Sequence, residues 1–243
     1  MTVMNRADIA RDFYIEDHAL LYGLLGKYAE ETCGEAGLEA LEKATVLYGR
    51  ERGLRMAMRA QRNGDELSPR NYLIYGEWSD DRGLCSSRLV SVTPQYKTES
   101  TACEWCHTWE KYGLMRYGRV YCTYIDRNLV KGFNPENELG IDGSLSKGDP
   151  CCGFHWIGVD YKDEAELEAD MKKKAELSDS NIKDFLYHTA HVYSALRRTF
   201  LVELGLSDAA SICGAAMREY AELLGSHKAA AILAEADQDF LSI

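Results

Sequence analysis

Apolar residues recur at every third or fourth position in two long N-terminal segments, 7–32 and 36–61. This period matches one face of an α-helix, so each segment predicts an amphipathic helix. Gly34 lies between the two segments and Gly37 at the start of the second, and these glycines are expected to separate the two helices. The pattern therefore predicts a helical hairpin in this part of the chain.

The same period returns towards the C-terminal end of the sequence. A long helix is expected from about Ile182 to Leu204, where Gly205 ends it. A second helix is expected after Ser207, which is a suitable N-cap, and it stops at Gly225. A last helix begins after position 226.

Between these helical regions the pattern changes to one typical of strands. Segment 72–102 predicts two or three strands, the first of them around Tyr72, Ile74 and Tyr75, with a turn over 79–83. Segments 104–113 and 119–131 then predict two short helices.

A second strand pair is expected further along the chain. Segments 139–145 and 151–159 alternate apolar and polar residues, and Gly148 and Asp149 form a turn pair between them. The fold class is therefore α+β: a small antiparallel sheet of about four strands flanked by N-terminal and C-terminal helical hairpins. We expect a single domain with three segments, 1–66, 67–161 and 162–243.

A run of charged residues over 162–174 predicts a further helix. Glu168 and Lys172, and also Asp170 and Lys174, have the i,i+4 spacing of favourable ion pairs on a helix surface. We interpret this run as a solvent-facing helix.

Charge and composition exclude several classes of function. The chain has 243 residues, with 39 acidic against 28 basic side chains and a net charge of -11. Such an acidic surface repels phosphate backbones, so nucleic acid is an unfavourable partner. No apolar run approaches the roughly 20 residues that span a bilayer, and charge interrupts the N-terminal segment before a secretory signal develops. We expect a cytoplasmic protein without a membrane partner.

Eight cysteines are many for a reducing compartment, where clustered thiols more often bind metal or do chemistry. They are Cys33, Cys85, Cys103, Cys106, Cys122, Cys151, Cys152 and Cys213. Cys103 directly precedes the helix expected from Glu104, and a helix N-terminus favours a thiolate. Cys103 is therefore a candidate nucleophile, and a buried structural thiol is the alternative.

Cys103, Cys106 and His107 also match the Cys-x-x-Cys-His pattern of covalent haem attachment. That attachment is normally made outside the cytoplasm, and we expect no haem here. Zinc is the stronger metal alternative, with Cys103 and Cys106 at ligand spacing. The remaining ligands would come from Cys122, Cys152, His107 or His155.

Two histidines and one aspartate have alternative interpretations. His188 shares an apolar helical stripe and is more typical of a core residue, whereas His191 lies on the face of Tyr187 and Arg198 and could reach a ligand. Asp149 stands next to a glycine in a hairpin, and its first role is that of a turn former.

The central segment carries several motif residues in a definite order. They are Cys103 with Gly113, Cys122 with Asp126, Phe133 with Pro135, and the closing Gly148, Asp149, Cys152 and Phe154. Through these residues the segment resembles the L-2-amino-thiazoline-4-carboxylic acid hydrolase family over roughly residues 100–156. Gly153 stands where the family often has an acidic residue, and Cys106 and Cys151 are additional. The closing motif also resembles that of 4-vinyl reductase domains, which are small-molecule-binding modules.

The family resemblance implies a hydrolase that opens a small cyclic amidine or a similar heterocycle at a C–N or C–S bond. Its catalytic group would be Cys103 as nucleophile, or a water molecule activated by Asp126 or His155. An arginine such as Arg116, Arg119 or Arg127 could hold a substrate carboxylate. The substrate-binding candidates are Cys106, His107, Cys122, Arg127, Asp149, Cys152 and His191.

The expected partner is a small-molecule substrate, the expected assembly is a homodimer, and no cofactor is expected. Two alternatives stay open. One is a non-catalytic binding or sensor module of the 4-vinyl reductase type. The other is a structural protein stabilised by zinc on Cys103, Cys106, Cys122 and Cys152.

Overall fold

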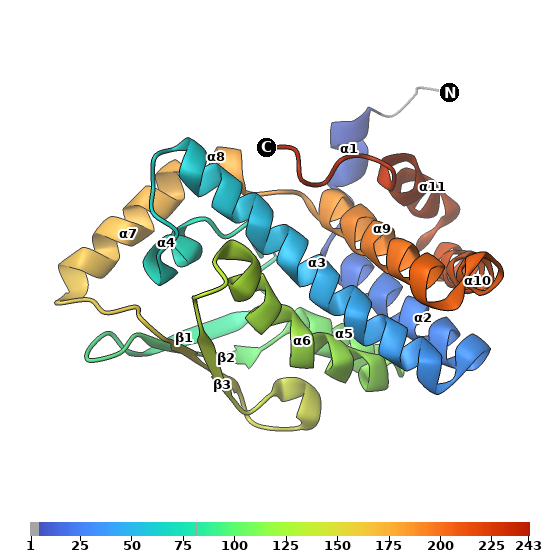
Figure 1. The fold of residues 1–243 in the computed structure, drawn as a ribbon, viewed down its shortest axis with the longest axis horizontal. Coiled ribbons are helices and arrows are strands. Elements are labelled where there is room, and N and C mark those ends of the chain that lie inside the picture. Colours follow the sequence, from blue (N-terminus) through green and yellow to red (C-terminus); the bar gives the residue numbers. More distant parts are fainter. Residues whose placement is uncertain (1–4, 81) are drawn as a thin grey trace. The chain divides into compact units, whose positions relative to one another are not determined.

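The computed structural model describes residues 5–80 and 82–243 (Figure 1). Its contacts divide the chain into two compact units. The helical unit comprises Met1–Tyr48, Glu104–Thr123 and Lys183–Asp239, and the sheet unit comprises Gly49–Cys103, Tyr124–Ile182 and Phe240–Ile243. Two helices, α3 (Glu35–Arg62) and α6 (Met115–Phe133), contribute residues to both units. That the chain forms one domain stays a prediction.

The helical unit joins the two predicted hairpins. Within it, α2 (Ile15–Cys33) packs against α9 (Phe185–Leu204) and α10 (Leu206–Leu224), and α5 (Glu104–Lys111) packs against α2. Gly34, between α2 and α3, has a φ of 60°, which a residue with a side chain rarely adopts. The helices that lie wholly in the helical unit are α1 (Arg6–Ala10), α2 (Ile15–Cys33), α5 (Glu104–Lys111), α9 (Phe185–Leu204), α10 (Leu206–Leu224) and α11 (Ser226–Glu235).

Trp109 fixes the position of α5 within the helical unit. Its indole is fully buried and donates a hydrogen bond to the carbonyl oxygen of Ala19 on α2, at 2.8 Å. Gly118 on α6 faces this ring so closely that a Cβ there would lie 2.2 Å from a ring carbon of Trp109. The contact holds the helix that directly follows Cys103.

The sheet unit contains the four expected strands in one antiparallel sheet, in the order β1-β2-β4-β3. The strands are β1 (Ser86–Ser91), β2 (Lys97–Ala102), β3 (Leu139–Asp142) and β4 (Cys152–Trp156). The hairpin of β3 and β4 is confirmed, although its strands are shorter than predicted, because a 3₁₀ turn, η1 (Leu145–Lys147), takes up part of the connection. The sheet carries two edges, at β1 and at β3.

Three sequence predictions are corrected by the structure. The segment around Tyr72 is a short helix, α4 (Pro69–Ile74), and not a strand, because Ser68 caps it and Pro69 occupies its first turn. Ser207 is not an N-cap, since α10 begins one residue earlier. Gly37 lies inside α3. One residue of the turn predicted over 79–83, Asp81, lies outside the described residues.

Alternation along β4 places its aromatic side chains and its histidine on opposite faces of the sheet. Phe154 and Trp156 point to one face of the sheet, where their rings stack at 5.9 Å between centroids. Tyr72 of α4 contacts Trp156 on this face and also contacts Phe133 of α6. His155 points to the opposite face and is therefore separated from Phe154 and Trp156.

Glycines allow α3 and α6 to cross at close range in the sheet unit. A Cβ at Gly53 of α3 would lie 2.1 Å from the carbonyl oxygen of Leu129, and one at Gly132 of α6 would lie 2.4 Å from the carbonyl oxygen of Arg50. No side chain fits between backbones at these distances. The crossing therefore sets where the side chains of α3 stand relative to those of α6.

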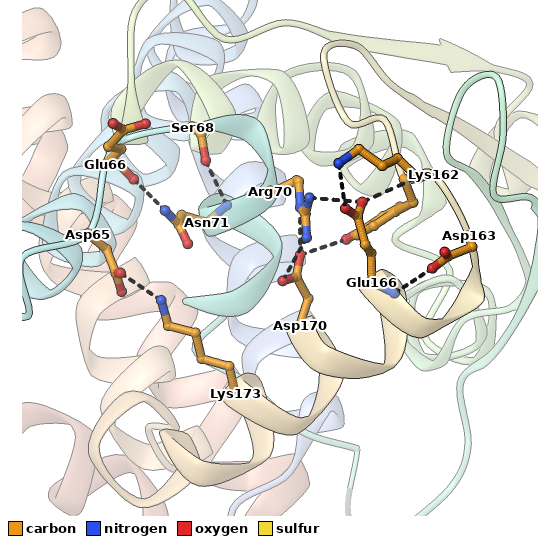
Figure 2. A network of polar contacts seen from close by, with 11 residues as sticks. Asp65, Glu66, Ser68, Arg70, Asn71, Lys162, Asp163, Glu166, Asp170 and Lys173 are labelled. Atoms are coloured by element: carbon orange, nitrogen blue, oxygen red, sulfur yellow. Dashed lines mark hydrogen bonds and ion pairs between the residues drawn. The ribbon is translucent and has the colours of Figure 1, made fainter.

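The helix predicted from the charge run is α7 (Glu164–Glu176), followed by the short α8 (Ser178–Asn181). Figure 2 shows that one side of α7 is bound to α4 by polar contacts. Arg70 donates to both oxygens of Asp170, at 2.9 and 3.0 Å, and Tyr161 also donates to Asp170. The predicted pair of Asp170 with Lys174 is therefore wrong, because a residue distant in sequence captures the aspartate.

The other predicted pair on α7 is wrong as well. Lys172 lies 3.9 Å from Glu176 rather than pairing with Glu168.

Among the described residues, no helix is long and apolar enough to cross a membrane.

Candidate functional site

Cys103 lies where the sequence places it, between the last residue of β2 and the first residue of α5. Its side chain is half-buried and forms no disulfide. The peptide N–H groups of the first turn of a helix have no partner within the helix, and they favour negative charge at its start. This position is suited to an ionised thiol.

Asp126 lies within the electrostatic range of Cys103. It is half-buried on the part of α6 that belongs to the sheet unit, and its carboxylate forms neither a hydrogen bond nor an ion pair with any residue that the structure describes. Burial raises the pKa of Asp126 to about 6, and the negative charge of Cys103 contributes to this rise. The positive charges of Arg52 and Arg127 act in the opposite direction.

A half-buried carboxyl without partners is unusual, because buried charges are normally paired or hydrogen-bonded. Such groups with a raised pKa concentrate at functional sites, where a base must work near neutral pH. The pair of Cys103 and Asp126 therefore combines a thiol with a base suited to neutral pH.

Arg52 connects this pair to a buried charge cluster that sequence reasoning missed. Arg52, Arg55 and Arg59 stand on successive turns of α3 and all bind Glu77, whose side chain is fully buried. Burial works to raise the pKa of Glu77, but the charges of Arg55 and the other two arginines overcome it and hold this pKa well below its usual range. The spacing of three arginines at i, i+3 and i+7 was the available sequence signal.

His155, the third predicted catalytic residue, lies elsewhere. Its Nε2 is 2.5 Å from Oδ2 of Asp142 on the neighbouring strand β3. Its ring stands over Gly140, where a Cβ would be 3.0 Å from Cβ of His155. The histidine belongs to the face of the sheet opposite to Phe154 and Trp156, and its partner is an exposed carboxylate.

Two of the predicted binding residues support the loop between β3 and β4. Asp149 accepts a hydrogen bond from the backbone N–H of Ser144, at 2.7 Å, which is the turn-forming role expected of it. The thiol of Cys152 accepts a hydrogen bond from the backbone N–H of Leu145, at 3.2 Å. Both side chains therefore hold the backbone of this loop.

The helical unit contains four other predicted binding residues. Cys106 and Cys122 are half-buried, and His107 is exposed on α5. His191 is fully buried, with its ring 4.8 Å from that of Tyr48. His188 is buried too, as expected of a core residue.

The arginines predicted to hold a substrate carboxylate differ in their surroundings. Arg116 is bound to Glu30 through two hydrogen bonds, at 2.6 and 2.9 Å. Arg119 is exposed on the helical-unit part of α6. Arg127 is exposed as well, but its charge acts on Asp126, so it is the predicted arginine with an electrostatic link to the candidate site.

Tyr72 is a second residue that sequence reasoning missed. Burial raises its pKa, the charge of Asp126 raises it further, and the charge of Arg52 opposes this. The phenol therefore stays protonated across the neutral range. The sequence pattern predicted a strand around Tyr72. A strand at this position gave no reason to expect Tyr72 beside α6, so its role was missed.

Metal ligands are not gathered in the described part of the chain. No group of three or more histidine, cysteine, aspartate or glutamate side chains stands close enough there to hold an ion. The zinc alternative, with its four cysteines, stays a prediction.

A family model gives the comparison that identifies the chain. The model of the L-2-amino-thiazoline-4-carboxylic acid hydrolase family matches residues 14–156, which is more than half of the sequence. No curated protein and no solved structure matches the chain. The name of the family indicates a hydrolase with an aminothiazoline carboxylate as its substrate. The matched range contains Cys103 and Asp126, and the chain belongs to the L-2-amino-thiazoline-4-carboxylic acid hydrolase family.

Proposed function

We propose that the protein hydrolyses a 2-aminothiazoline-4-carboxylate or a closely related cyclic amidine, with Cys103 as nucleophile and Asp126 as its base. The observation that carries this proposal is the half-buried carboxylate of Asp126, which lies within electrostatic range of the Cys103 thiol and forms no hydrogen bond with the described residues. A thiolate adds readily to the electron-poor carbon of an amidine, and the start of a helix favours the thiolate.

In the first half-reaction, Asp126 accepts the proton of the Cys103 thiol. The sulfur then adds to the ring carbon that lies between nitrogen and sulfur. The bond from this carbon to the ring sulfur breaks, and the departing thiolate takes the proton that Asp126 holds. The product of this step is an isothiourea that joins the substrate carbon to Sγ of Cys103.

In the second half-reaction, Asp126 accepts a proton from a water molecule while the water adds to the isothiourea carbon. The remaining water proton moves from the added oxygen to the imine nitrogen, and the carbon–Sγ bond breaks. Asp126 returns its proton to the thiol of Cys103, and the open-chain N-carbamoyl thiol is released. One water molecule is consumed in each cycle, and no oxidant or reductant is required. A carboxyl with a pKa of about 6 suits both proton transfers near neutral pH.

Substitution of the nucleophile tests this proposal. Cys103→Ser is expected to lower kcat for ring opening by about a thousandfold or more, because a hydroxyl is a much poorer nucleophile at neutral pH. The matched control is Cys33→Ser, which makes the same chemical change at a half-buried thiol of α2. The measurement is release of the free product thiol from L-2-amino-thiazoline-4-carboxylic acid.

Two results would contradict the proposal. Full turnover by Cys103→Ser would remove the cysteine nucleophile and leave a water molecule activated by Asp126. Stoichiometric binding by the unaltered protein without any product would instead favour the binding-module alternative. Rapid alkylation of Cys103 by iodoacetamide that is slowed by bound substrate would support the cysteine nucleophile.

A further inference from the structure

Three aromatic rings stand together on the face of the sheet that carries Phe154. The rings of Phe154 and Trp156 are nearly parallel, at 25°, and the ring of Tyr72 lies 5.8 Å from that of Trp156. All three side chains are half-buried, so each keeps part of its surface accessible.

The orientation of Trp156 is fixed by a hydrogen bond. Its indole N–H donates to the hydroxyl oxygen of Thr98 on β2, at 3.0 Å. Tyr72 is held from the other side by Phe133 of α6, at 5.7 Å between ring centroids. The rings are therefore positioned before any ligand arrives, which lowers the entropy cost of binding.

The hydroxyl of Tyr72 has no partner among the residues that the structure describes. Phe133, which its ring contacts, stands seven residues after Asp126 on α6, so both occupy the same face of that helix. The negative charge of Asp126 acts on the Tyr72 phenol. A protonated donor, a partnerless carboxylate and the ring of Trp156 thus border one region of the sheet unit.

We infer that Tyr72 and Trp156 bind the planar ring of the substrate, with the Tyr72 hydroxyl donating a hydrogen bond to it and the indole of Trp156 stacking against it. This inference rests on the proposed function, because it takes the cyclic amidine as the ligand. A protonated amidine is a flat cation, which both an aromatic face and a nearby carboxylate stabilise. Ring opening removes the planar ring and therefore weakens the stacking, which favours product release.

Binding measurements test the inference separately from catalysis. The parent protein is Cys103→Ser, titrated with L-2-amino-thiazoline-4-carboxylic acid by isothermal calorimetry. Adding Tyr72→Phe is expected to weaken binding about fivefold to tenfold, the value of one lost neutral hydrogen bond, with an unchanged melting temperature. Trp156→Leu is expected to weaken binding by a similar or larger factor, because it removes the stacked ring.

Tyr96→Phe is the matched control. Tyr96 is also a half-buried tyrosine of the sheet unit with a pKa raised by burial, but its ring contacts Tyr161 and the charge of Asp126 does not act on it. The control is expected to bind within twofold of the parent. Equal affinity of Tyr72→Phe and the parent would overturn the inference.

The same experiments separate the inference from the proposed function. Turnover that depends on Cys103, together with binding that ignores Tyr72, contradicts the inference alone. Binding that depends on Tyr72 in a protein that never opens the ring contradicts the proposed function alone. Absence of any binding to the parent contradicts both.

Discussion

At the scale of single residues, Asp126 places a cost on folding that its chemistry explains. A carboxyl whose pKa is raised in the folded state binds its proton more tightly there than in the unfolded chain. The resulting cost to stability is fully present above the folded pKa of about 6 and disappears as the pH falls towards the ordinary carboxyl value near 4. A carboxyl that destabilises the folded protein at neutral pH in this way is better explained by a role in catalysis than by a structural role.

Asp126→Asn is therefore expected to have opposite effects on stability and activity. The melting temperature should rise at about pH 8, where the wild-type side chain is ionised, and the difference should vanish below about pH 4. Activity should fall by about a hundredfold or more, and the rise of kcat/KM with an apparent pKa near 6 in the wild type should be lost. Melting curves and pH–rate profiles of both proteins measure this, and an unaltered pH–rate profile in the variant would exclude Asp126 as the base.

At the scale of secondary-structure elements, the crossing of α3 and α6 in the sheet unit positions Arg52 with respect to Asp126. Gly49 and Gly53 of α3 and Gly132 of α6 form the contact. Small residues at such a crossing let two helix backbones approach, and the side chains beside the crossing then converge. The electrostatic balance at Asp126 therefore depends on glycines that do no chemistry.

Gly53→Ala is expected to destabilise the protein by about 2 to 4 kcal/mol, because its Cβ would collide with backbone atoms of α6 that cannot move independently. Gly214→Ala in α10 is the matched control. The nearest atom to its Cβ would be the flexible end of Arg218 at 3.3 Å, so alanine should stabilise by about 0.5 to 1 kcal/mol. Urea unfolding measures both. Equal stabilities of the two variants would contradict the close crossing.

At the scale of the whole molecule, the eight cysteines and the acidic surface raise the question of how much metal the purified protein carries. None of the eight cysteines, all of which the structure describes, forms a disulfide. The net charge of -11 leaves the molecule with an excess of carboxylates that could attract cations loosely. Metal that is merely attracted is distinguished from a built site by its stoichiometry.

Protein purified under reducing conditions is expected to carry well under one zinc ion per chain and no haem that survives acid extraction. Elemental analysis and the absorption spectrum of the denatured protein measure this. Stoichiometric zinc that is lost in Cys103→Ser together with a large fall in melting temperature would support the zinc alternative instead, because metal-binding energy is folding energy in structural sites.

Local patterns in the sequence were sufficient for most elements. Gly205 and Gly225 ended helices where expected, α5 began directly after Cys103, and the turn at Gly148 and Asp149 joined two strands. These features depend on backbone conformation within a few residues, which the local side chains control. Tyr72 was misplaced because Tyr72, Ile74 and Tyr75 are residue types common in strands. The N-cap at Ser68 and the proline at position 69 instead begin a helix.

The sequence by itself determined the α+β class, the helix boundaries set by glycines, and the family whose motif includes Cys103 and Asp126. Only the tertiary structure decided which of the candidate residues meet. It placed Asp126 near Cys103 and Arg52, sent His155 to the other face of the sheet with Asp142, and attached Asp170 to Arg70. The physical reason is that a pKa and an ion pair depend on burial and on charges distant in sequence, whereas helix and turn signals act between neighbours.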